Sequence, residues 1–331
     1  MKKIINTPET VVDDMCSGFV RAHKDYVSLN EKYRVIYRKE INTKKVNLIS
    51  GGGSGHEPSH AGFVGRGMLD GAVCGDVFAS PSVMQIYNAI TKLESDKGVL
   101  LVIKNYSGDV MNFDGAADMA EEDDDIKVEK VYVNDDVAVT DSLYTVGRRG
   151  VAGTVFVHKI AGAMAETGAE LSEVKAVAEK VIANVRTMGF ALTSCTVPAK
   201  GEPTFDIEDG DMEYGVGIHG EPGVSRDKTV SAAELAGRTV KRILEDMPIE
   251  RGSDVAVLLN GLGGTPVQEL YILYNEVADI LENASINIYF NLVGNYMTSL
   301  DMAGASVSIL KLDGQLKQLL TAEADTPALK I

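Results

Sequence analysis

One apolar run limits the possible folds more than any other feature of this sequence. Residues 99–103 are five consecutive apolar residues, and Lys104 follows them. A strand that is apolar at every position is typical of a parallel sheet with helices on both faces, because a strand with one solvated face alternates apolar and polar residues. Further strand-like runs at 46–50 and 128–133 are separated from it by helical patterns. The order of these segments predicts an α/β fold with a largely parallel sheet.

The second half of the chain has the same organisation. A buried strand at 255–259 precedes the glycine-rich turn 260–266 and a helix, and further strands are predicted at 288–293 and 306–310. Because a single hydrophobic core rarely extends over a chain of 331 residues, we predict two α/β domains. Each domain is expected to have a mostly parallel or mixed sheet flanked by helices.

The boundary between these domains is placed at the end of a predicted helix. Apolar residues at 174, 177, 181, 185 and 188 form one helical stripe over residues 172–188, and Gly189 follows. This pattern divides the chain into residues 1–188 and residues 189–331.

Composition excludes several classes of function. The net charge of −16 argues against a nucleic-acid surface, which needs clustered Lys and Arg. No apolar run reaches the ~18–20 residues of a membrane span, and the N-terminus lacks the apolar core of a secretory signal. We therefore expect a cytoplasmic protein that binds neither nucleic acid nor membrane.

Metal and disulfide sites are not expected either. Cys16, Cys74 and Cys195 have no paired spacing, which predicts buried thiols, with neither a disulfide framework nor a zinc site. Five consecutive carboxylates at 121–125 cannot all face one ion, so this acidic run is expected to be solvated. No metal is expected on this chain.

A glycine-rich stretch, "LISGGGSGHEPSHAG" at residues 48–62, suggests a phosphate site at first sight. An apolar run leads into four glycines among residues 51–55, and Pro58 is in position to begin a helix. No lysine follows to complete a P-loop, and His56 stands where the dinucleotide fingerprint needs its third glycine. The second glycine turn fails the same test at Pro266. The first loop therefore offers backbone groups and His56 to a ligand, and a solely structural role for His56 stays open.

Two further stretches have a similar character. Asp109 lies in "NYSGD", directly after the apolar run that ends at Lys104, and is either a helix cap or a site carboxylate. His219 lies in "GVGIHGEPG", where glycines on both sides leave its ring accessible. This setting favours a ligand or nucleophile over a core histidine. His23, His60 and His158 lie in regular segments and are expected to be structural.

Long motifs in a fixed order resemble those of one known family. They include residues 48–81, "VLLVIKNYSGDVMNF", "VYVNDDVAV", "DSLYTVGRRGVAGT", "CTVPAKGEPTF", "MEYGVGIHGEPG" and "NYMTSLDMAG". On these residues the chain resembles the substrate-binding subunit of the dihydroxyacetone kinase family, over essentially its full length.

The resemblance implies a homodimer that binds dihydroxyacetone covalently. In this family a histidine ring nitrogen adds to the ketone carbon as a hemiaminal, and the matching residue here is His219. His56 and Asp109 match the residues that flank the substrate hydroxyls, with Asp109 as the candidate general base. Which of the two takes the hydroxyl proton is left open. The remaining substrate-binding positions match Gly53, Ser54, Gly55 and Lys104.

The resemblance also implies where the phosphoryl donor is held. Family members that use ATP directly carry an additional helical domain, whereas this chain looks like the stand-alone subunit of the bacterial phosphotransferase-linked system. No cofactor is then expected here, because ADP and magnesium belong to a separate helical subunit that a phosphoenolpyruvate-driven relay recharges. A helical partner that binds free ATP is the lesser option.

One alternative function belongs to a different class. Some members of the family bind the ketone without transferring phosphate and act as sensors with a transcription regulator. Because His56, Asp109 and His219 are all present, the sequence favours catalysis over sensing.

Overall fold

The N-terminal half forms a mixed sheet that is mostly parallel. The computed structural model describes residues 2–140 and 146–331, so Asp141–Thr145 of the motif that begins "DSLYT" lie outside the described residues. The strand order is β1-β2-β4-β3-β5-β6. Strands β4, β3, β5 and β6 pair in parallel with one another, whereas β2 pairs antiparallel with both β1 and β4. The bounds are β1 Val27–Asn30, β2 Val35–Arg38, β3 Asn47–Ser54, β4 Gly71–Val77, β5 Val99–Lys104 and β6 Val128–Val133.

Helices cover both faces of this sheet, as the apolar run at 99–103 predicts. Leu100 and Val102 pack in one core with helices α4 (Thr154–Glu166) and α5 (Leu171–Asn184). Leu101 and Ile103 point the opposite way, into a core with α2 (Val83–Lys92) and α3 (Ser107–Asp124). Each successive side chain of β5 is thus buried, because neighbouring residues of a strand face opposite sides. Helix α1 (Val11–Ala22) lies against β1 and β4.

The C-terminal half forms a second six-stranded sheet, in the order β11-β10-β12-β7-β8-β9. Only β10 and β11 are parallel within the described part of this sheet, so it is mixed and mainly antiparallel. Its strands are β7 Val185–Ala191, β8 Asp211–Tyr214, β9 Ser225–Lys228, β10 Asp254–Gly261, β11 Asn287–Gly294 and β12 Gly304–Leu312. Helices α6 (Ala232–Asp246) and α7 (Val267–Asn283) cover its outer face.

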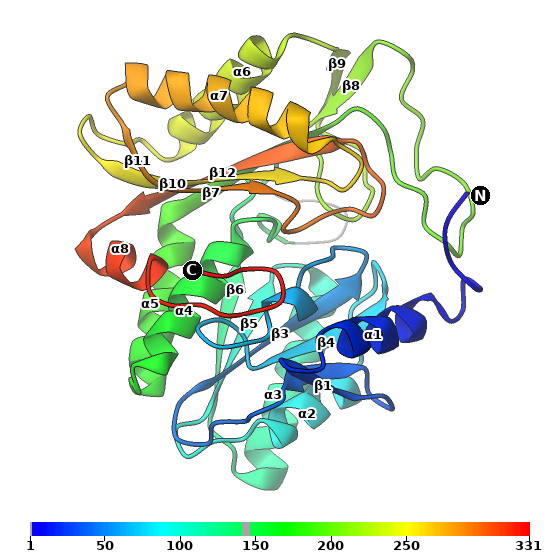
Figure 1. The fold of residues 1–331 in the computed structure, drawn as a ribbon, viewed down its shortest axis with the longest axis vertical. Coiled ribbons are helices and arrows are strands. Elements are labelled where there is room, and N and C mark those ends of the chain that lie inside the picture. The colour runs from blue at the N-terminus through cyan, green and yellow to red at the C-terminus, as the bar shows by residue number, and fades with distance from the viewer. Residues whose placement is uncertain (1, 141–145) are drawn as a thin grey trace.

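The two sheets share a middle layer of helices. Helices α4, α5 and α8 (Gly314–Leu320) lie between them (Figure 1). One core cluster contains Val102 of the first sheet, Val177 of α5 and Leu258 of the second sheet. No helix within residues 2–140 and 146–331 is long and apolar enough to cross a membrane.

Two local predictions are wrong. The helix predicted over 172–188 ends at Asn184, and residues 185–188 begin strand β7. The apolar residues at 185 and 188 that completed the helical stripe are buried in a sheet instead, where β-branched residues such as Val185 and Thr187 are well accommodated. The predicted domain boundary therefore falls inside β7, and the division into two domains stays a prediction.

The predicted helix start at Pro58 is the second error. The chain makes turns there and then a single 3₁₀ turn, Ala61–Phe63. The glycines that were expected to form a loop belong to β3, which continues to Ser54. Of the two predicted occurrences of the strand, glycine turn and helix pattern, the one in the second half is observed, where β10 leads through the turn to α7.

Candidate functional site

The glycines of β3 bring its backbone close to a buried ion pair. Gly52 has a φ of +147°, and a Cβ at this position would collide with the side-chain amine of Lys104 and approach Asp109 Oδ2 at 3.3 Å. Only glycine provides both this conformation and this space. Lys104 is the last residue of β5, and Asp109 lies in the first turn of α3. The stretch that resembled a phosphate loop therefore makes room for a lysine and a carboxylate.

His56 is held by the C-terminal half of the chain. Its Nδ1 lies 2.8 Å from the carbonyl oxygen of Thr298, and the Thr298 N–H donates to the His56 carbonyl. The Leu300 N–H donates to the carbonyl of Gly55 in the same way. Since a carbonyl can only accept, Nδ1 of His56 carries the proton and Nε2 has the lone pair. His56 is fully buried.

Asn260, predicted to begin the second glycine turn but found near the end of β10, fixes the segment that holds His56. Its Oδ1 accepts the N–H groups of Tyr296 and Met297, and its Nδ2 donates to the Met297 carbonyl at 2.7 Å. The end of β10 thus holds the backbone at 296–297, directly before Thr298, which contacts His56.

His219 meets His56 edge to face. The two Nε2 atoms are 3.2 Å apart, and the ring planes are 89° apart. Because Nε2 of His56 is the acceptor, His219 donates its Nε2–H and has its lone pair on Nδ1, which makes no hydrogen bond within the described residues. The rings of Phe78 and Tyr106 pack edge-on against His219, with centroid distances of 5.5 and 4.3 Å.

A buried salt bridge shapes the loop that carries His219. The His219 N–H donates to Glu221 Oε2 at 2.8 Å, and Glu221 Oε1 accepts from Arg149 at 3.1 Å. Arg149 also pairs with Asp136 at 2.6 Å and donates to the Gly215 carbonyl. A Cβ at Gly217 would overlap the Glu221 carboxylate, which explains the small residue there. The sequence analysis did not single out Arg149 and Glu221, which support the His219 loop, although both lie inside the quoted motifs.

Both histidines are neutral at physiological pH. Burial, followed by the charge of Lys104, lowers the pKa of His56 to about 3. Burial also holds the pKa of His219 well below its usual value, with smaller contributions from His56, Lys104 and Arg149. A neutral imidazole retains the lone pair that a nucleophile or a proton acceptor requires.

A cavity of about 440 Å³ opens beside this histidine pair. Three of the predicted site residues line it, Gly53, Asp109 and His219. The other lining residues are Phe78, Ser80, Tyr106, Ser107 and Gly108. Phe78 and Ser80 were not predicted, because they follow β4, a strand that the sequence analysis did not detect.

The remaining predicted residues lie behind this lining. His56 lies behind His219, to which it is hydrogen-bonded. The Ser54 hydroxyl donates to the Gly75 carbonyl at 2.7 Å. The side chain of Lys104 is fully buried, and its Nζ lies 3.5 Å from Asp109 Oδ2. The structure thus gathers all the predicted residues in one region, and the roles assigned to them stay predictions.

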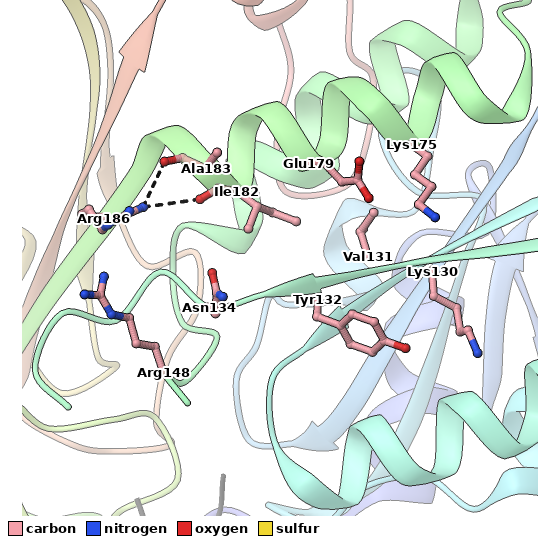
Figure 2. Close-up of a pocket in the computed structure, with 10 residues that line it drawn as sticks. All are labelled: Lys130, Val131, Tyr132, Asn134, Arg148, Lys175, Glu179, Ile182, Ala183 and Arg186. Carbon is pink, nitrogen blue, oxygen red and sulfur yellow. Dashed lines mark hydrogen bonds between the residues drawn. The ribbon is translucent and has the colours of Figure 1, made fainter. Parts of the chain in front are cut away.

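A second cavity, of about 720 Å³, lies between β6 and α5 and shares no lining residue with the first (Figure 2). Its cations are already paired: Arg148 and Arg186 both contact Asp246, Lys175 contacts Glu129, and Lys130 contacts Asp114. Arg186 also donates to the Ile182 and Ala183 carbonyls. Since these charges are satisfied internally, we place the candidate site at the histidine pair.

No cluster of three or more His, Cys, Asp or Glu side chains suited to a metal ion is found in the part of the chain that the structure describes. The acidic run 121–125 lies at the exposed C-terminal end of α3. The three cysteines are buried and unpaired, as predicted.

The fold and the site together define an α/β protein with a cavity where two neutral histidines lie near a carboxylate. Comparisons with known proteins identify its family. Residues 17–328 match the Dak1 domain. The chain is 54% identical to the dihydroxyacetone-binding subunit DhaK of PTS-dependent dihydroxyacetone kinase 1 from Listeria innocua, over 99% of this chain and 100% of that protein. The chain therefore belongs to the Dak1 family, and within it to the DhaK type.

Solved structures support the same assignment. The dihydroxyacetone kinase of C. freundii has a TM-score of 0.91 and 37% identity, covering 98% of this chain; the chain spans 60% of the length of that kinase. The dihydroxyacetone kinase operon co-activator DhaQ also has a TM-score of 0.91, with 33% identity over 96% of this chain and 97% of that one.

Proposed function

We propose that this chain is the dihydroxyacetone-binding subunit of a dihydroxyacetone kinase. The observation that carries the proposal is the joint position of Asp109 and His219 in the lining of one cavity, with His56 in hydrogen-bond contact behind His219. The subunit name of the Listeria relative supports the choice of substrate. The product of the reaction is dihydroxyacetone phosphate.

The histidine pair is suited to adding an N–H group across a ketone. Nε2 of His219 bonds to the carbonyl carbon of the substrate while its proton passes to Nε2 of His56, which has the lone pair. His56 then gives that proton to the substrate oxygen as the C=O π bond opens. The product is a neutral hemiaminal, and His56 returns to its starting state. Glycerol has no carbonyl and cannot form this bond, so selection depends on a reaction as well as on shape.

Asp109 is the base for the second step. With the ketone bound to His219, a terminal hydroxyl of the substrate has a fixed orientation, which removes much of the entropic barrier to transfer. The Asp109 carboxylate lies in the first turn of α3, facing the cavity, and accepts the hydroxyl proton while the oxygen attacks the phosphoryl group.

The phosphoryl group comes from a second protein in this proposal. The Listeria relative is described as PTS-dependent, which favours a helical subunit that carries ADP and magnesium and is recharged from phosphoenolpyruvate. The neutral histidine pair needs no metal or cofactor on this chain for hemiaminal formation. We place the subunit in the cytoplasm, as a homodimer.

A sensor function is the second candidate. The DhaQ co-activator has the same fold over nearly its whole length, so the fold itself does not separate catalysis from sensing. Asp109 distinguishes catalysis from sensing. Phosphoryl transfer requires a base for a terminal hydroxyl of the substrate, whereas binding the ketone on His219 does not.

The deciding experiment is a product assay on the purified chain. Dihydroxyacetone phosphate is measured with and without a helical partner subunit, charged with ADP, magnesium and a phosphate source. We expect product only in the presence of the charged partner. Ketone binding without product in either mixture would assign the chain to the sensors, and product from ATP with this chain alone would contradict a separate donor subunit.

A further inference from the structure

His60 lies beside the site, although the sequence predicts a structural role for it. Its ring is buried, and its Nε2 is 3.1 Å from the side-chain amine of Lys104. Neither His60 nor the Lys104 amine is among the groups that the proposed reaction uses.

The amine of Lys104 has three hydrogens and three acceptors around it. The acceptors are the carbonyl of Gly51 at 3.1 Å, Nε2 of His60 at 3.1 Å and Oδ2 of Asp109 at 3.5 Å. An ammonium group donates three hydrogen bonds and accepts none, so His60 must present a lone pair at Nε2. Because Lys104 is fully buried, no solvent is available to replace a lost acceptor.

A second buried histidine can accept a hydrogen bond from His60 in this tautomer. With its lone pair on Nε2, His60 has its proton on Nδ1, and that atom lies 3.0 Å from Nε2 of His158. His158 then carries its own proton on Nδ1, an atom without a hydrogen bond within the described residues. Burial and the charge of Lys104 lower the pKa of both rings, that of His158 to about 3. The chain of donors therefore runs in one direction, from Lys104 through His60 to His158.

The distance between Lys104 and Asp109 is long for a buried pair. Charge-assisted N–H···O contacts are typically ~2.7–2.9 Å, whereas this one is 3.5 Å. Two acceptors lie closer to the amine, the Gly51 carbonyl and Nε2 of His60, both at 3.1 Å, and they compete with the carboxylate for its hydrogens. An ammonium in full contact with Asp109 would compete with a substrate hydroxyl for the same carboxylate.

From this arrangement we infer that His60 is a positioning residue, which holds the Lys104 ammonium back so that Asp109 stays available to accept the proton of the substrate. The inference rests on the proposed function, since it assigns Asp109 the role of base. If the inference is correct, loss of the acceptor at His60 lets the Lys104 ammonium move into contact with Asp109. Turnover then falls, while ketone binding at His219 changes little.

Two polar substitutions separate positioning from simple packing. In His60→Gln the longer amide reaches the place of Nε2 and keeps an acceptor for Lys104. In His60→Asn the shorter amide corresponds to Nδ1 and does not reach it. We expect kcat to fall at least about tenfold in His60→Asn, towards the ~10²-fold typical of a misplaced catalytic group, with KM for dihydroxyacetone within about threefold. His60→Gln should recover most of kcat.

Phe63→Leu is the matched control, because Phe63 is buried in the same core beside His158 and has no polar group that could reach Lys104. It should leave kcat near the wild-type value. Equal losses in His60→Asn, His60→Gln and Phe63→Leu would overturn the inference.

The tautomer of His60 tests the inference without any assay of turnover. Two-bond ¹H–¹⁵N correlation spectra of the wild-type protein, labelled at its five histidines, distinguish the Nδ1–H from the Nε2–H form. We expect Nδ1–H for His60, and an Nε2–H or doubly protonated ring would overturn the inference whether or not the variants fold. A wild-type protein that binds ketone but makes no product would instead refute the proposed function, with the Nδ1–H tautomer intact.

Discussion

His219 and His56 share one proton across 3.2 Å, with their rings nearly perpendicular. The direction of this hydrogen bond is set by the other ring nitrogen of His56. This atom, Nδ1, donates to the Thr298 carbonyl at 2.8 Å, which leaves Nε2 of His56 as the acceptor. A backbone group of the C-terminal half therefore decides which nitrogen of His219 carries the hydrogen. The two halves of the chain must be assembled before the pair can work as the proposed nucleophile and base.

The histidine pair can be tested through the adduct it is proposed to form. In His56→Ala, His219 keeps its place on the Glu221 loop but loses the acceptor for its Nε2 proton. We expect hemiaminal formation from [2-¹³C]dihydroxyacetone to slow about 10²-fold or more, the range of general acid–base effects. The loss of the ¹³C carbonyl signal is followed by NMR. Adduct formation at the wild-type rate would show that His56 is not the proton carrier.

The base is tested separately from the nucleophile. Asp109→Asn preserves the shape of the side chain but removes its ability to take a proton, so phosphoryl transfer should fall by about 10²–10⁴-fold while ketone still binds at His219. Asp118→Asn, in the same helix with a side chain 65% exposed, serves as the control and should be as active as wild type. Near-normal turnover of Asp109→Asn would leave His56 as the proton acceptor.

The sequence predicted the parts of this molecule that depend on local pattern. Buried runs such as the one at 99–103 gave the central strands, because a strand covered on both faces has a distinctive composition. Short or polar strands such as Ser225–Lys228 were missed, since their stability comes from pairing with neighbours rather than from their own residues. The helix predicted to 188 failed for a related reason: Val185 and Met188 suit both a helical stripe and a strand.

The site was predicted through its motifs, and its supporting contacts were not. Nothing in the local sequence shows that Arg149 reaches Glu221, 72 positions later, or that His60 faces Lys104. The glycine loop was expected to offer its backbone to a ligand, and this stays a prediction. What approaches Gly52 is the protein's own lysine, and only the tertiary structure could show this.

Acid should weaken the fold through its buried histidines. The pKa of His158 is about 3 in the folded protein and about 6.5 when exposed, so below pH 6.5 the unfolded chain binds one more proton. For His158 alone, the free energy of unfolding then decreases by about 1.4 kcal/mol per pH unit as pH falls from 6 towards 4. Asp136, whose pKa burial raises to about 6, acts in the opposite direction.

A variant isolates the histidine contribution from that of the carboxyl groups. The difference in unfolding free energy between wild type and His158→Gln, from urea titrations at several pH values, should shrink as the pH falls, since only the wild type has this histidine to protonate. A difference that does not change between pH 6 and 4 would mean that His158 is already charged in the folded protein, or exposed to solvent.

Arg149 should be a stability determinant as well as a support for His219. It is buried between Asp136 and Glu221, so Arg149→Met leaves two carboxylates in the interior without their cation. Breaking a buried pair in this way costs about 3–5 kcal/mol, measured as a lower urea midpoint with an unchanged slope. Arg66→Met is the matched control, because Arg66 and Glu323 are both mostly exposed and such pairs contribute about 0–1 kcal/mol. Equal destabilisation of the two variants would contradict this role of Arg149. In that case Arg149 would not support the His219 loop, and Arg149→Met would bind the ketone as tightly as wild type.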